Sequence, residues 1–200
     1  MNAIGKVTID NPSVLAPMAG VTDLAFRLLA KEMGCGLVYS EMISAKGLLH
    51  ENCRTKELVR IDPRERPTTI QLFGSVPAEL AEAARRVAEM GADIIDFNMG
   101  CPTHKIVRNG DGSALLRSPV LAGAILKAMV EAVDIPVTVK IRPQFGRLGE
   151  PFHIMDSMPA HFANRRMRSF QLYQHIQMPK QRSGPFRESR PFRQSTLFQI

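Results

Sequence analysis

The residues best suited to chemistry lie in the segment DFNMGCPTHKIVRNGDGSALLRSP, residues 96–119. Cys101 follows an apolar strand and a glycine, in a loop before a helix, where a thiol can act as a nucleophile or a proton donor. Asn98 supplies a neutral hydrogen-bond donor and acceptor nearby. Gly110 and Gly112 allow a sharp turn or a close approach to a ligand. The alternative is that Cys101 is only a small apolar residue at a strand end.

Polar residues also stand at the ends of strands that are otherwise apolar. Gln71 lies in TTIQLF, Asn98 ends DIIDFN and Lys140 lies in PVTVKI. Side chains near the C-terminal ends of parallel strands face the active site, so we expect these three to do so. An ammonium group in an apolar strand is costly without a ligand or an acidic partner. Gln71 is equally consistent with a sheet residue whose hydrogen bonds are satisfied, and Met18 with core packing.

The elements that must position these residues alternate along the chain. Apolar, β-branched runs predict five strands, at residues 13–16, 37–40, 68–73, 93–98 and 136–141. Capping residues, prolines and glycines predict helices at about residues 23–33, 77–90 and 118–133, and residues 44–60 are expected to be partly helical. This alternation indicates parallel βα units, with a sheet covered on both faces. The pattern alone leaves open a βα-barrel and a doubly wound sheet.

Composition restricts the class of protein. The 200 residues suit one domain, and 44% of them are apolar, which is enough for a sizeable core. No apolar run reaches the length of about 18 residues that spans a bilayer, and the N-terminus does not resemble a secretory signal. The three cysteines form no CxxC pair, which argues against a disulfide framework and a zinc ribbon. We therefore expect a cytoplasmic protein with no metal site and no membrane partner.

The motif around Cys101 resembles the signature of the tRNA-dihydrouridine synthases, in which Asn-x-Gly-Cys-Pro is followed by Lys and by Gly-x-Gly-Ser-Ala-Leu-Leu. This chain has Asn98, Gly100-Cys101-Pro102, Lys105 and the run at residues 110–116, with Asp111 where Ala is more usual. Four further segments match the family in the same order, at residues 16–23, 40–42, 71–74 and 139–142. The resemblance is to the bacterial type of the family and covers residues 11–142.

This resemblance implies a fold and a reaction. The fold would be a TIM (β/α)8-type barrel, truncated after about five strands, with residues 1–142 as its N-terminal part. An inactive, truncated form of the enzyme is an open alternative. The family reduces uridine in tRNA to 5,6-dihydrouridine, with FMN as cofactor and NAD(P)H as reductant. Hydride passes to C6 of a uracil ring flipped out of the tRNA, and Cys101 would protonate C5.

The resemblance also implies which residues bind. Pro17, Met18 and Ala19 would pack on the flavin. Gln71 would hydrogen-bond the edge of its ring system, and Lys140 would stabilise negative charge on the reduced ring. Asn98 would contact the flavin or the target uracil, and Lys105 would contact the tRNA; loop cations of its kind are often only solvated.

Residues 143–200 differ from the rest in composition. Residues 141–200 carry ten Lys/Arg against three Asp/Glu, which accounts for the whole net charge of +7. Beyond Arg142 there are six prolines, eight of the twelve Phe/Tyr residues and no valine. No strand or helix period continues there, so this basic, Pro/Phe-rich tail is predicted to be disordered or the product of a shifted reading frame.

Two other functions stay open. The chain could be another FMN-dependent barrel oxidoreductase, although the combined motif around Cys101 is not expected in such a protein. It could also be a non-catalytic RNA-binding remnant, whose Arg- and Phe-rich tail contacts phosphate and stacks on bases. The sequence leaves the oligomeric state undetermined.

Overall fold

The computed structural model describes residues 2–141, so the predicted tail at 143–200 lies outside the described residues. The strands are β1 (Asn2–Ile4), β2 (Val7–Ile9), β3 (Val14–Leu15), β4 (Leu37–Ser44), β5 (Thr68–Phe73), β6 (Ile94–Met99) and β7 (Val137–Ile141). The α-helices are α1 (Leu24–Glu32), α2 (Ala45–Leu49), α3 (Cys53–Leu58), α4 (Pro77–Glu89), α5 (His104–Arg108) and α6 (Pro119–Ala132). Two 3-10 helices are η1 (Pro63–Glu65) and η2 (Gly112–Arg117).

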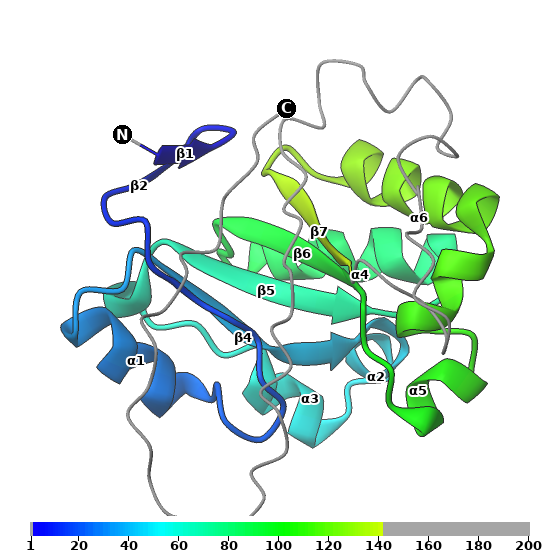
Figure 1. Ribbon diagram of the computed structural model, residues 1–200, viewed down its shortest axis with the longest axis horizontal. Coiled ribbons are helices and arrows are strands. Elements are labelled where there is room, and N and C mark those ends of the chain that lie inside the picture. The colour runs from blue at the N-terminus through cyan, green and yellow to red at the C-terminus, as the bar shows by residue number, and fades with distance from the viewer. Residues whose placement is uncertain (1, 142–200) are drawn as a thin grey trace, which may run out of the picture.

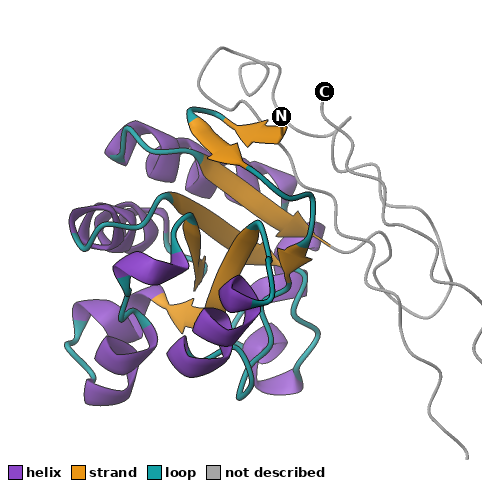
Figure 2. Ribbon diagram, turned by 90° about the vertical axis from the view of Figure 1, so that its left-hand side faces the viewer, coloured by secondary structure: helices purple, strands orange, loops and turns teal. Residues whose placement is uncertain are grey.

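The main sheet is parallel and follows the order of the sequence, β3-β4-β5-β6-β7. It curls as part of a barrel wall, with the helices against its outer face (Figure 1, Figure 2). All five predicted strands are present, and β5 has the predicted bounds of residues 68–73. The α/β architecture and the five-stranded part of a βα-barrel are therefore confirmed, and the doubly wound sheet is excluded by the strand order.

The core lies between the outer face of the sheet and the helices. Leu72, Phe97 and Val139 point outward from β5, β6 and β7, where they join Leu80 of α4 and Leu126 of α6 in one buried cluster. Burying one Leu or Phe side chain contributes about 1.5–3 kcal/mol. Because side chains alternate along a strand, the neighbours of these residues point to the inner face, and the polar residues of the motifs stand there.

A hairpin that the sequence analysis did not predict closes the N-terminal end of the inner face. Gly5, with φ +60, begins the tight turn between β1 and β2. Ile4 and Ile9 of the hairpin are buried against Tyr39 of β4 and Ile94 of β6. The inner face is thus apolar at its N-terminal end.

An irregularity in β4 explains why this strand is longer than predicted. The register with β5 shifts between Tyr39 and Met42, which leaves one extra residue on β4. Ser40 stabilises the bulge, because its Oγ accepts from Gln71 N at 3.0 Å and donates to Glu41 O at 2.8 Å. The strand continues to Ser44, and the bulge brings Met42 beside Gln71.

Three observations bear on other classes of site. No helix within residues 2–141 has the length and apolar composition to cross a membrane. In the same range, no three side chains of the metal-ligating types come together. Cys35, Cys53 and Cys101 are free thiols.

Candidate active site

The loop after β3 carries the predicted cofactor residues Pro17, Met18 and Ala19. Thr22 holds this loop from within, because its Oγ1 accepts from Met18 N at 3.0 Å and donates to Met18 O at 3.2 Å. Gly20 has φ +76, and no atom lies within 4 Å of where a Cβ would stand. Its N–H donates to a carboxylate oxygen of Glu41, at the C-terminal half of β4. Met18 is 39% exposed, so the loop presents an apolar side chain and open backbone.

A buried ion pair lies behind this loop. Arg27 Nε donates to Glu65 Oε2 at 2.6 Å, and the two side chains are 2% and 0% exposed. Two further nitrogens of Arg27 donate to backbone carbonyls, Nη1 to Thr22 at 3.1 Å and Nη2 to Arg60 at 2.8 Å. Arg27 therefore joins the loop after β3 to the segment before β5.

A chain of polar side chains crosses the inner face from β7 to β5 and back to β6. Thr138 Oγ1 donates to Asp96 Oδ1 at 2.6 Å, and Gln71 Nε2 donates to Asp96 Oδ2 at 2.6 Å. Asn98 Nδ2 then donates to Gln71 Oε1 at 2.8 Å. The pairing of the strands produces this arrangement, because Asp96 lies opposite both Gln71 and Thr138 in register.

Asn98, the last of these hydrogen-bonded side chains, holds the loop that carries Cys101. Asn98 Oδ1 accepts from Gly100 N at 3.1 Å and from Cys101 N at 2.9 Å. On the other side, Cys101 O accepts from Ser113 N at 3.0 Å. Cys101 is half-buried, and its Sγ lies 3.3 Å from Thr103 Oγ1. The thiol is thus fixed at the C-terminal edge of the sheet with part of its surface accessible.

Gly112 is required for this packing. Its φ is +60, and a Cβ there would stand 2.7 Å from Cys101 O and 2.9 Å from Cγ2 of Ile106. A side chain at this position would displace the backbone of Cys101. The close approach expected of Gly112 is therefore made to the cysteine loop.

Asp96 is the charged centre of the inner face. Burial raises the pKa of its carboxyl to about 6, against the lowering effects of the hydrogen bonds from Thr138 and Gln71 and of the positive charge of Lys140. Lys140 is half-buried and lies opposite Asn98 in register on β7. The acidic partner that the sequence analysis required for Lys140 is thus present, as a neighbouring charge.

Two residues of the motif lie at the edge of the site. Lys105 is exposed on the short helix α5, which protrudes from the C-terminal edge of the sheet (Figure 1). Asp111, the residue that departs from the family pattern, is buried, and desolvation raises its pKa, with a hydrogen bond to Ser75 acting in the opposite direction. Asp111 therefore acts within the packing of this loop against the residues before α4.

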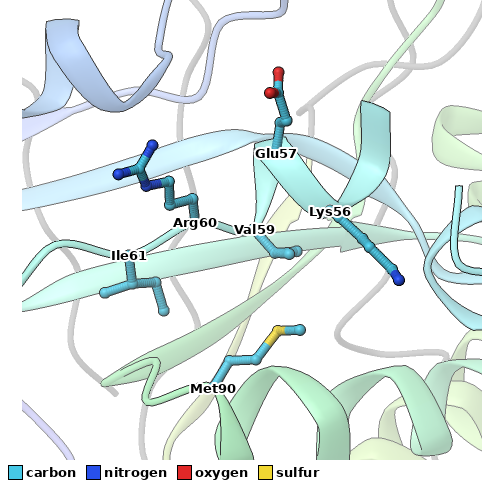
Figure 3. A pocket seen from close by; sticks show the side chains of 6 residues that line it. All are labelled: Lys56, Glu57, Val59, Arg60, Ile61 and Met90. Carbon is cyan, nitrogen blue, oxygen red and sulfur yellow. The ribbon is translucent and has the colours of Figure 1, made fainter. Parts of the chain in front are cut away.

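A separate groove of about 400 Å³ lies outside the barrel wall. Figure 3 shows its lining residues: Lys56, Glu57, Val59, Arg60, Ile61 and Met90. None of the predicted site residues lines it, so this groove is separate from the candidate site.

A sequence model of the family described as "Dihydrouridine synthase (Dus)" matches residues 14–147. The chain belongs to the dihydrouridine synthase family. The matched range agrees with the resemblance found over residues 11–142.

Similar proteins give the same result. The chain is 47% identical over 144 residues to tRNA-dihydrouridine synthase B of Pseudomonas aeruginosa, a match that covers 72% of this chain and 43% of the relative. It is 50% identical over 141 residues to the enzyme of the same name from Klebsiella pneumoniae, covering 70% and 43%. A probable tRNA-dihydrouridine synthase 1 of Synechocystis is 47% identical over 141 residues, covering 70% and 39%. The chain thus spans less than half the length of these dihydrouridine synthases.

A solved structure of histamine dehydrogenase from Rhizobium sp. 4-9 has a TM-score of 0.50 at 16% sequence identity, over 70% of this chain and 33% of that one. At this identity the likeness shows the fold alone. It agrees with a sheet that is part of a βα-barrel.

The geometry brings several of the predicted site residues of this family member together. Gln71 and Asn98 are hydrogen-bonded to each other, and Asn98 contacts the backbone of Cys101. The loop of Met18 is connected to β4 by the hydrogen bond from Gly20 N to the carboxylate of Glu41. The sequence analysis did not predict Asp96 as a site residue; the available signal was a carboxylate among the apolar residues Ile94, Ile95 and Phe97 of the same strand.

Proposed function

We propose that this chain carries the part of a tRNA-dihydrouridine synthase that protonates the uracil ring during the reduction of uridine to 5,6-dihydrouridine in tRNA. The observation that carries this proposal is the placement of Cys101. Its backbone is held on both sides, by Asn98 and by Ser113, while its thiol stays partly accessible. A proton donor needs this combination, because it must be positioned against its substrate and must regain a proton from solvent afterwards.

The residues at this edge of the sheet also fit a flavin such as FMN. Met18 and the open backbone at Gly20 supply an apolar surface and a space that no side chain fills. Gln71 has one further donor and one further acceptor position beyond the bonds it makes within the chain, which suits the edge of an isoalloxazine ring. We assign Pro17, Met18 and Ala19 to the face of the flavin, and Gln71 and Lys140 to its polar edge.

The chemistry divides between the cofactor and the protein. A bound FMN, reduced by NAD(P)H, supplies the hydride that adds to C6 of the uracil. Cys101 Sγ donates its proton to C5, and the thiolate regains a proton from water, so that the ring gains one hydride and one proton. Lys140 places a positive charge at the inner face, where charge develops as the ring is reduced. Asn98 holds Cys101 and contacts the uracil or the flavin.

The partner in this proposal is tRNA in the cytoplasm. Lys105, exposed on α5 beside the cysteine loop, would contact a phosphate of the nucleic acid. Residues 2–141 supply five strands of the barrel wall. In barrels of this type the phosphate of a cofactor usually binds at the loops after strands seven and eight, so these residues account for the ring end of the flavin.

Nucleoside mass spectrometry tests the proposal. The chain is incubated with FMN, NADPH and an unmodified tRNA transcript, and dihydrouridine is quantified. We expect product from the parent chain and a rate at least about 100-fold lower for Cys101→Ala. The variant Cys53→Ala is the control for loss of a thiol, since Cys53 is an exposed free thiol at the start of α3. Absence of dihydrouridine with the parent, or equal rates for the parent and Cys101→Ala, would overturn the proposal.

A further inference from the structure

The polar chain on the inner face has a defined direction. An ionised carboxylate can only accept hydrogen bonds, and a backbone N–H can only donate them. Asp96 stands at one end, accepting from Thr138 and Gln71, and the N–H groups of Gly100 and Cys101 stand at the other, donating to Asn98. The two amides between them must therefore both point their NH2 groups towards Asp96.

This direction has a consequence for the cysteine loop. If the amide of Gln71 turned over, its oxygen would face the carboxylate of Asp96 and its NH2 would face that of Asn98. Asn98 would then have to turn over as well, and its NH2 would face the N–H groups of Gly100 and Cys101. Each reversal places like groups opposite each other in a buried setting, where Gln71 is 1% and Asn98 6% exposed.

We propose that Asp96 is a positioning residue for Cys101. It orients the side-chain amides of Gln71 and Asn98, so that Asn98 Oδ1 points at the N–H groups of Gly100 and Cys101 and holds the loop that carries Cys101. The inference rests on the proposed function of Cys101 as the proton donor. Asp96 does not touch the thiol, and it acts through two side chains on β5 and β6. The arrangement depends on how the strands are paired as well as on the residue types, because the pairing places Gln71, Asp96 and Thr138 side by side on three neighbouring strands.

The cost of the charge supports a specific role for Asp96. Its side chain is 0% exposed, and burial raises its pKa to about 6, so the ionised form is less stable here than in water but is still the main form at pH 7.5. An apolar residue at this position would avoid the cost of burying the charge. The two hydrogen bonds of 2.6 Å that it accepts are among the shortest on the inner face.

Two isosteric substitutions, alone and combined, can test the direction of these side-chain hydrogen bonds. In Asp96→Asn, the new amide keeps its oxygen towards Gln71 and donates to Thr138 Oγ1, whose hydroxyl can turn to Ile95 O, 3.5 Å away. In Thr138→Val, the carboxylate of Asp96 still accepts from Gln71. Each single variant therefore preserves the direction. In the double variant, Asn at position 96 has no partner at 138 and makes one hydrogen bond with Gln71 in either orientation, so position 96 no longer sets the direction of the two amides.

The measurement is amide hydrogen exchange at Gly100 and Cys101, resolved by NMR on the full chain at pH 7.5. We expect the two single variants to exchange like the parent, and the double variant to exchange about tenfold faster at these two amides. In such a result the effect of the double variant on exchange exceeds the sum of the two single effects. Loss of packing at each site separately would give additive effects. Unchanged exchange in the double variant, or equal acceleration in both single variants, would overturn the inference.

Two further variants separate orientation from general stability. Thr69→Val changes a buried hydroxyl on the same face of β5, one without a hydrogen-bond partner among residues 2–141, and is expected to leave the two amides unchanged. Asp96→Leu removes the acceptor altogether and is expected to accelerate their exchange, with the secondary structure checked by circular dichroism. If Asp96→Leu does not fold, the double variant still decides the question.

Dihydrouridine assays then separate the two proposals. If Asp96 positions the proton donor, kcat falls in the double variant while the KM for tRNA stays within about twofold, since the phosphate contact assigned to Lys105 is not altered. If the parent makes no dihydrouridine but the exchange pattern appears as expected, the positioning role stands and the proposed function fails. If the parent is active and the exchange pattern is absent, the inference about Asp96 fails alone.

Discussion

At the scale of single residues, the candidate site combines a partly accessible thiol, Cys101, with a buried carboxyl group, Asp96. Asp96 is buried on the inner face between the uncharged polar side chains of Gln71 and Thr138, and Lys140 is a neighbouring positive charge. Because its pKa in the folded chain is about 6, well above the ordinary value of 3.8, the folded state binds a proton more tightly than the unfolded state does. Stability must therefore depend on pH through this group.

The sign of that dependence is a testable prediction. A carboxyl with a raised pKa contributes stability that is present below its unfolded pKa and is lost as pH rises through the folded pKa of about 6. We expect the free energy of unfolding of the parent, measured relative to Asp96→Asn, to increase by roughly 1 kcal/mol for each unit of pH from 6 down to 4. Urea denaturation across this range measures it.

Other carboxyl groups do not disturb the comparison. A hydrogen bond from Arg64 lowers the pKa of Asp62 to about 2, and burial raises the pKa of Asp111. Both groups are present in the parent and in Asp96→Asn, so their contributions cancel in the difference. A difference that stays flat between pH 4 and pH 8 would show that Asp96 is not the titrating group.

At the scale of elements, the ion pair of Arg27 and Glu65 connects α1 with η1 and with the loop after β3. The pair is almost wholly buried, and Glu65 also accepts from Asp62 N at 3.0 Å. Removing one partner of a buried pair leaves an uncompensated charge, whereas replacing both by apolar residues is often nearly neutral. The single and double substitutions therefore distinguish the free-energy cost of an unpaired buried charge from the stability that the ion pair itself contributes.

We expect Arg27→Met to lower the free energy of unfolding by about 3–5 kcal/mol, because the carboxylate of Glu65 then stays buried without its cation. Arg27→Met combined with Glu65→Leu is expected to recover most of this loss. Chemical denaturation of the parent and the two variants measures both effects. Equal destabilisation in the single and double variants would contradict this account and would assign the loss to the contacts of Arg27 with Thr22 and Arg60.

The same scale shows why some elements could be predicted from sequence and others could not. The strands of the main sheet are apolar and β-branched because both their faces are covered, and that composition identifies β5 to the residue. The hairpin of β1 and β2 has strands of three residues, and its Ile4 and Ile9 become core residues only by packing on Tyr39. The second half of β4 could not be predicted, because the bulge at Ser40 breaks the alternation of side chains along the strand.

The candidate site divides in a similar way. Cys101, Asn98 and Gln71 could be found because residue type and motif spacing identify them. Asp96 could not, because its role arises from its register with Gln71 and Thr138, and register is a property of the paired strands. The fixed positions of Pro17, Met18, Ala19 and Lys140 relative to a cofactor stay predictions.

At the scale of the whole molecule, β3 and β7 are the edge strands of the described five-stranded sheet. The helix that follows β3, α1, and its C-cap residue carry a row of exposed apolar side chains at helical spacing. Phe26 is 39%, Leu29 53% and the C-cap Met33 82% exposed. On α6, near the other side of the sheet, Val120 is 78% exposed without apolar neighbours of this kind on its own helix. A row of exposed apolar residues lowers solubility more than a single one does.

We expect Leu29→Gln combined with Met33→Gln to raise the solubility of the chain, measured as the protein concentration left in solution at increasing ammonium sulfate. Gln is a good helix former and leaves the net charge unchanged, so the melting temperature should stay the same within about 2 °C. Val120→Gln is the matched control and is expected to have a smaller effect, because it removes one isolated side chain. A fall in melting temperature in the α1 variant alone would contradict the exposure of this row and would show that it is packed in solution.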